Sequence, residues 1–236
     1  MAPNQLAQLI RWIAANFGKD IVVAIRDTIQ SQYKRVFASR NILILGPKQS
    51  GKSSLLMYLT DGRPFEVVDG EIRPPAPTAL AAVVDEKFVL QKGNWLRLKK
   101  DVPGDLDLRA TWAQAITDIR PHGIIYMLDG RNADDVLRSN VEEIKEAVLR
   151  HYSATGIGHL ATLHVFLNFA DHWASSAAEV RRRVRVVRES LELVVEASPA
   201  WSSLRIGAAE THLSPNRTAW EEMARALHHF GADLVA

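Results

Sequence analysis

The sequence of 236 residues contains no cysteine, which excludes disulfide bonds and thiolate metal sites and is typical of a reducing compartment. It also has no apolar run of about 18 residues, the length that a membrane-spanning helix needs. Neither sign of charge dominates, because the formal net charge is only +2 although 24% of the residues are charged. We therefore expect a cytoplasmic protein that does not bind nucleic acid.

Hydrophobic residues make up 47% of the chain, enough to build one large domain with an appendage. The predicted appendage is residues 1–40, where apolar side chains recur at helical spacing, as in Leu6, Leu9, Ile13 and Phe17. We expect an amphipathic helical extension there, and residues 5–33 are a candidate for peripheral membrane contact. Because its basic residues are few and mixed with acidic ones, packing on a partner or on the protein's own domain is the favoured alternative.

A glycine-rich segment directly follows an apolar run. Residues 42–45 predict a buried strand, and residues 46–53, GPKQSGKS, fit the pattern G-x-x-x-x-G-K-[ST]. In this pattern the loop N–H groups surround phosphate oxygens, the lysine pairs with the β- and γ-phosphates, and the final hydroxyl binds Mg²⁺. A chance match is disfavoured because a helix-compatible run follows. The predicted phosphate-binding residues are Gly46, Lys48, Gln49, Ser50, Gly51, Lys52, Ser53 and Ser54.

Apolar runs and helical patterns alternate along the rest of the chain. Strands are predicted near residues 42–45, 80–90, 95–100, 123–128, 163–167 and 204–206, and helices after the glycine loop and near 108–119, 136–151, 179–196 and 218–230. This order predicts an α/β fold with a mostly parallel sheet, helices on both faces and one antiparallel edge strand. Residues 61–77, rich in proline and glycine, are expected to form a long loop that is functional or mobile.

Polar residues follow the predicted strands, where ligands of such sheets bind. Asp101 ends one strand and can hold Mg²⁺ through water, while Gly104 can present its N–H to a γ-phosphate. Thr78, in the loop before the second strand, is a candidate third metal ligand. A simple Pro-Gly turn is the alternative interpretation of residues 101–104.

A second polar segment, Asn168 to Asp171, follows the core strand LHVFL. An aspartate there can accept hydrogen bonds from N1–H and the N2 amino group of guanine, a donor pair that adenine lacks. The alternative is an ordinary turn, because Asn and Asp are common turn residues. The predicted guanine-binding residues are Asn168, Phe169, Asp171, Ala208 and Ala209, the last two supplying a backbone N–H to the purine O6.

The order of these motifs resembles that of the Ras superfamily of small GTPases, and most closely its ADP-ribosylation-factor branch and the signal-recognition-particle receptor beta subunit. The resemblance covers residues 41–236 and rests on GPKQSGKS, Pro77-Thr78, DVPGD at 101–105, LNFAD at 167–171 and the weaker GAA at 207–209. It implies a P-loop NTPase fold with a six-stranded sheet, GTP or GDP with Mg²⁺ as ligands, and two switch loops that order when GTP binds.

Three residues depart from the family pattern. Asp105 stands where the family usually has the glutamine that orients the attacking water, so Asp105 and Lys52 are the candidate catalytic residues. Lys48 replaces a residue that is often small or acidic, and Phe169 replaces the lysine of the guanine motif. Together these departures predict slow intrinsic GTP hydrolysis.

The leading hypothesis is a GTP-binding switch that recruits a protein effector and depends on an activating partner for fast hydrolysis. One alternative is a pseudo-GTPase that binds nucleotide without turnover and serves as an interaction module. Another is an ATP-using P-loop enzyme. The arginine-rich stretch at residues 181–188 is either a solvated helix face or a partner-docking surface.

Overall fold

The computed structural model describes residues 40–61, 64–68, 71–73, 82–90, 94–101, 104, 110–150, 152, 160–197, 199–213 and 217–235. The predicted helical extension lies outside these residues, so it stays a prediction.

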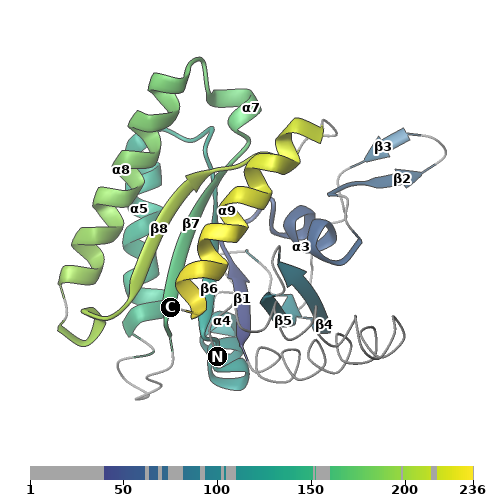
Figure 1. The fold of residues 1–236 in the computed structure, drawn as a ribbon. Coiled ribbons are helices and arrows are strands. Elements are labelled where there is room, and N and C mark those ends of the chain that lie inside the picture. Colours follow the sequence, from purple (N-terminus) through teal and green to yellow (C-terminus); the bar gives the residue numbers. More distant parts are fainter. Residues whose placement is uncertain are drawn as a thin grey trace, which may run out of the picture. The chain divides into compact units, whose positions relative to one another are not determined.

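A six-stranded sheet forms the centre of the domain, in the order β4-β5-β1-β6-β7-β8 (Figure 1). The strands are β1 (Asn41–Leu45), β4 (Ala82–Leu90), β5 (Asn94–Asp101), β6 (Gly123–Asp129), β7 (Thr162–Asn168) and β8 (Arg205–Glu210). Neighbouring strands are parallel except for the antiparallel edge pair of β4 and β5. This confirms the predicted strand number, the mostly parallel sheet and the antiparallel edge strand.

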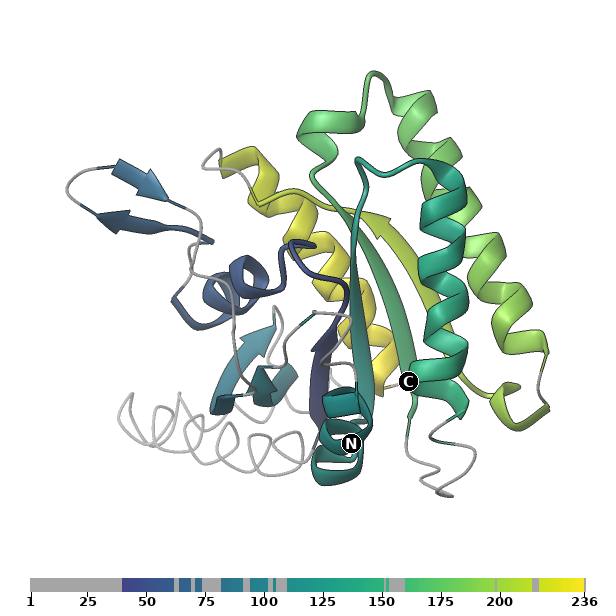
Figure 2. The same cartoon turned by 180° about the vertical axis from the view of Figure 1, so that it is seen from behind.

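Helices cover both faces of the sheet (Figures 1 and 2). They are α3 (Lys52–Asp61), α4 (Ala110–Ile119), α5 (Asp134–Ile144) with the π-helical turn η2 (Lys145–Leu149), α7 (Ala170–Trp173), α8 (Ala177–Glu196), the 3₁₀ turn η3 (Pro199–Trp201) and α9 (Arg217–Val235). None of these described helices is both long enough and apolar enough to cross a membrane.

Alternating side chains of the strands bury two separate cores. In β1, Leu43 and Leu45 pack with α4, α5 and α8 on one face, whereas Ile42 and Ile44 pack with α3 and α9 on the other. Because both faces are covered, the central strands are apolar throughout, which is why they were recognisable as short continuous runs. The carboxyl ends of β1, β6 and β7 are thereby held at one edge of the sheet.

The segment predicted as a long loop contains a short hairpin instead. Strands β2 (Glu66–Val68) and β3 (Glu71–Arg73) pair antiparallel and form a separate two-stranded sheet. Pairing satisfies the backbone N–H and C=O groups that an unpaired loop would leave to solvent. Arg73 also donates a hydrogen bond to Glu71 at 2.7 Å.

Candidate nucleotide-binding site

The glycine loop between β1 and α3 needs glycine at two positions. Gly46 and Gly51 have φ angles of +143° and +98°, which disfavour any residue with a side chain. A Cβ at Gly46 would overlap the Met127 carbonyl oxygen, and one at Gly51 would overlap the Asn168 side-chain amide. The loop is therefore pressed against the ends of β6 and β7, and its two glycines are required by geometry.

Lys52, the first residue of α3, lies inside this loop. Its side chain is buried, and its ammonium donates hydrogen bonds to the carbonyl oxygens of Gly46 at 2.9 Å and Pro47 at 2.8 Å. Gly104 is also buried, and a Cβ there would overlap the Lys52 ammonium and the loop backbone. The structure thus brings together Lys52 and Gly104, the two residues predicted to contact the terminal phosphates.

The other predicted phosphate-binding residues of the loop are close to Lys52 in the sequence and differ in their exposure. Ser50 is buried, Ser53 and Ser54 are half-buried in the first turn of α3, and Lys48 and Gln49 are exposed. Gln49 has a φ of +63°, so the loop makes a left-handed turn at its outermost point. Successive turns of this kind direct several backbone N–H groups to one side, which suits an anion.

Asn168 joins the glycine loop to the segment that follows β7. Its amide Nδ2 donates to the Ser50 carbonyl oxygen at 3.1 Å, and the Asn168 side chain is almost wholly buried. The backbone carbonyl oxygen of Asn168 accepts hydrogen bonds from Gly130 N at 3.1 Å and Trp173 Nε1 at 2.9 Å. Asn168 therefore fixes three loops relative to one another.

Three side-chain oxygens of this region are buried without a hydrogen-bond partner among the described residues: Ser50 Oγ, Asn168 Oδ1 and Thr211 Oγ1. Buried polar atoms are normally paired, and an unpaired one costs about 1–3 kcal/mol. All three lie on segments at the carboxyl ends of strands. A ligand with hydrogen-bond donors would pair with these oxygens. The glycines, where a Cβ would overlap neighbouring atoms, are also consistent with a binding site.

Phe169 adopts a left-handed backbone conformation, with φ at +62°, and Arg131 lies over its ring. The guanidinium carbon is 4.0 Å from the ring centroid. Asp129 orients Arg131 by accepting from Nε at 2.9 Å and Nη2 at 2.7 Å, and these hydrogen bonds raise the pKa of Arg131. Sequence reasoning missed Arg131, although an acid at a strand end followed two residues later by arginine is a local signal of such a pair.

One member of the arginine-rich stretch, Arg183, holds the neighbouring loop at residues 130–132. Arg183 donates to the Gly130 carbonyl oxygen and to the Asn132 carbonyl oxygen, the latter at 2.9 Å. Glu179 holds Arg183 at 2.9 Å and also binds Arg182, and these hydrogen bonds lower the pKa of Glu179 to about 2. Part of the stretch is thus structural rather than a freely solvated face.

The predicted base-binding residues occupy different positions at this edge. Asp171 is exposed on α7, 3.6 Å from His172. Ala208 and Ala209 lie inside β8, paired with Val165 and Phe166, because β8 extends to Glu210.

The residue that follows β8 at the site is Thr211. Its N–H donates to the Leu167 carbonyl oxygen at 2.8 Å, and its own carbonyl oxygen accepts from Ala170 N at 3.1 Å. The structure therefore brings Thr211, and not the two alanines, next to the Asn168 segment.

The predicted metal ligands are only partly described. Asp101 is the last residue of β5, which neighbours β1 in the sheet, so its backbone lies at the same edge as the glycine loop. The predicted ligand Thr78 lies outside the described residues, and so does the candidate catalytic residue Asp105. Within the described ranges no group of three or more His, Asp or Glu residues is arranged to hold a metal ion.

No family model matches the sequence, and no curated protein matches it. Solved structures do match the fold. The mammalian SRP receptor has a TM-score of 0.55 at 16% identity, covering 81% of this chain and 100% of that chain. The signal recognition particle receptor SRb-GTP/SRX complex from Chaetomium thermophilum has a TM-score of 0.54 at 13% identity, covering 79% and 97%.

A GTP-binding protein from the hyperthermophilic archaeon Sulfolobus solfataricus, in complex with GDP, has a TM-score of 0.54 at 12% identity. The match covers 91% of this chain and 60% of that chain. The fold is therefore a P-loop fold. More particularly it is the fold of the SRP receptor structures, which confirms the fold that the motif resemblance implies.

Proposed function

We propose that this protein is a GTP-binding switch. The observation that carries the proposal is the hydrogen bond from Asn168 to the Ser50 carbonyl oxygen, which couples a base-recognition segment to a phosphate loop. Such coupling lets one ligand engage both segments at once. The matched structures include proteins described as bound to GTP or GDP, which supports a guanine nucleotide as that ligand.

The phosphate half of the proposed site uses the glycine loop. Lys52 exchanges its contacts with the Gly46 and Pro47 carbonyl oxygens for phosphate oxygens, and the Gly104 N–H donates to the γ-phosphate. Ser53, Thr78 and Asp101 would hold Mg²⁺. Bound Mg²⁺ neutralises charge on the β- and γ-phosphates.

The base half uses the segment after β7. Asp171 accepts from the guanine N1–H and N2 amino group, and Asn168 Oδ1 supplies an acceptor that is already buried and unpaired. Phe169 packs against the base and is held in place by Arg131. The backbone around Thr211 takes the role first assigned to Ala208 and Ala209, since it lies beside Ala170.

Hydrolysis is proposed to be slow. Asp105 stands where a neutral water-orienting residue is usual, and a carboxylate beside the γ-phosphate is repelled by it. An activating partner that shields this charge would speed the reaction, and the switch loops would bind an effector in the GTP state. We place the protein in the cytoplasm, with residues 5–33 as its candidate peripheral membrane contact.

The test is calorimetric titration of GTP, GDP and ATP with Mg²⁺ into nucleotide-free protein, followed by single-turnover phosphate release. Guanine-selective binding with slow release is the expected result. The Asp171→Asn variant should lose guanine affinity and gain affinity for xanthine nucleotides, whose edge is altered at C2. Equal binding of ATP and GTP by the unaltered protein would contradict the proposal.

The departures at Asp105 and Phe169 favour one second candidate, a nucleotide-binding interaction module without turnover. The same phosphate-release measurement separates the two. Guanine-selective binding with no phosphate released, even at long incubation, would favour the module.

A further inference from the structure

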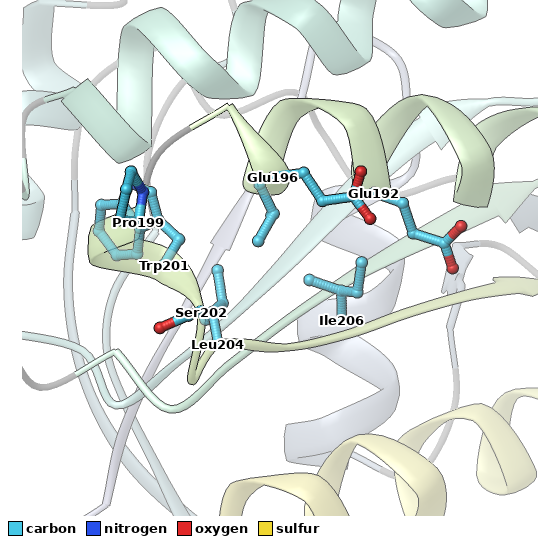
Figure 3. Close-up of a pocket in the computed structure, with 8 residues that line it drawn as sticks. Glu192, Glu196, Pro199, Trp201, Ser202, Leu204 and Ile206 are labelled. Atoms are coloured by element: carbon cyan, nitrogen blue, oxygen red, sulfur yellow. The ribbon is translucent and has the colours of Figure 1, made fainter.

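A cavity of about 290 Å³ lies at the opposite end of the domain from the glycine loop. It is formed by the last turns of α8, the turn η3 and the first residues of β8 (Figure 3). Since the site described above lies at the carboxyl end of β8 and this cavity lies at its amino end, the two are separate.

The rim of the cavity is acidic. Glu192 and Glu196 stand one helical turn apart at its mouth (Figure 3). Helix energetics disfavour both positions, because like charges four residues apart repel and a negative charge opposes the dipole at a helix C-terminus. Glu192 is held by Arg188 at 3.0 Å, whereas Glu196 is exposed and has no ion-pair partner among the described residues. The pair with Arg188 gives Glu192 a role in α8, but the stability of α8 does not explain Glu196.

The floor of the cavity is apolar. Val195, Trp201 and Leu204 are each 8–9% exposed, and Ile206 is half-buried. Next to the rim, Leu193 is 69% exposed, the more exposed of the two large hydrophobic side chains that stand out from the described surface. Leu193 lies on the same helix turns as Glu192 and Glu196, so an exposed apolar side chain adjoins the two carboxylates.

We propose that this acidic pocket docks a basic, apolar segment of a partner protein. The alkyl stem of a lysine or arginine lies on Trp201 and Ile206, its charge sits between Glu192 and Glu196, and a neighbouring apolar side chain covers Leu193. A cation at this place relieves the repulsion between the two carboxylates and complements the helix C-terminus. The cavity volume suits one long side chain rather than a complete small-molecule ligand. This docking does not depend on the proposed nucleotide site.

The test uses four acetylated, amidated tripeptides that differ only in the central residue: Leu-Arg-Leu, Leu-Lys-Leu, Leu-Gln-Leu and Leu-Glu-Leu. Each is titrated at low salt into the full-length, isotope-labelled protein, and backbone amide shifts are followed by NMR. The arginine and lysine peptides should shift amides at residues 192–206 with millimolar affinity. The glutamine peptide should bind at least fivefold more weakly, and the glutamate peptide should not bind.

Two variants locate the effect. Glu192→Gln/Glu196→Gln should weaken the arginine peptide at least fivefold, and Leu193→Ser should weaken all binding peptides about threefold. The matched control is Asp135→Asn/Glu142→Gln, which removes the same charge from exposed positions on α5. Equal weakening by the control, equal binding of the arginine and glutamine peptides, or shifts outside residues 192–206 would each overturn the proposal.

Discussion

The two halves of the candidate site are built in different ways. The phosphate half rests mainly on one contiguous segment, residues 46–53, with Gly104 beside it, and its lysine donates to carbonyl oxygens of the same loop. The base half is assembled from three loops, around Gly130, Asn168 and Thr211, that meet only in the folded chain. A local motif can therefore encode the first half, whereas the second depends on pairs of residues far apart in sequence.

Removing the lysine of the phosphate half should have the largest effect. We expect Lys52→Met to weaken GTP and GDP binding by about 100-fold or more, because a charge-assisted contact to phosphate is worth up to about 3 kcal/mol. The measurement is calorimetric titration, with circular dichroism to verify folding. Lys145→Met is the matched control, an exposed lysine on the turn η2 outside the site, and it should change affinity by less than a tenth as much.

Cutting the connection between the halves should come next. Asn168→Ala removes the hydrogen bond to the Ser50 carbonyl oxygen and leaves that buried acceptor unpaired, at about 1–3 kcal/mol. Nucleotide affinity should fall by about 10- to 100-fold. Asn132→Ala is the control, since Arg183 binds Asn132 through its backbone carbonyl. Unchanged affinity in Asn168→Ala would mean that the halves bind independently.

Arg131→Ala should impair the base half alone. Loss of the guanidinium over the Phe169 ring removes about 0.5–2 kcal/mol of binding free energy, so GDP affinity should fall by about two- to thirtyfold. Affinity for pyrophosphate, which engages only the phosphate half, should not change. Arg138→Ala, an exposed arginine on α5, is the control. An equal loss for pyrophosphate would contradict the division into two halves.

Glu179→Gln should have the smallest effect, because Glu179 acts on the base half only through Arg183. GDP affinity should change by less than about threefold. The pKa of Glu179 is lowered to about 2 by its hydrogen bonds to Arg182 and Arg183, so its stabilisation is present above the ordinary pKa and lost as pH falls towards 2. Between pH 5 and pH 2, the midpoint temperature of thermal unfolding should therefore fall more steeply in the unaltered protein than in the variant.

The sheet and the phosphate loop were predictable because their signals are local. Short apolar runs marked the strands, and the spacing of Gly46, Gly51 and Lys52 marked the loop. The hairpin of β2 and β3 was not predicted because each strand has only three residues. Its pairing overrides the turn-like composition of the segment around it.

The end of β8 was misplaced for a different reason. Gly207 and the two following alanines have low strand propensity, and their small size is typical of a loop. In the structure the His164 ring packs against Gly207, where a Cβ would overlap it. The small residues thus accommodate a bulky neighbour on β7, and no feature of residues 205–210 alone reveals that neighbour. Arg131 differs, because its pairing with Asp129 has a local signal, and only its contact with the Phe169 ring, on another loop, has none.

The hydrogen bond from Asn168 to Ser50 also has a consequence for folding, because it joins residues 118 positions apart. During synthesis the glycine loop emerges early, but the amide that holds it emerges only after β6 and β7. Contacts of such high sequence separation form late. We therefore expect the loop, the most recognisable stretch of the sequence, to be among the last parts to reach its native geometry, and a nascent chain that ends before residue 168 to lack it.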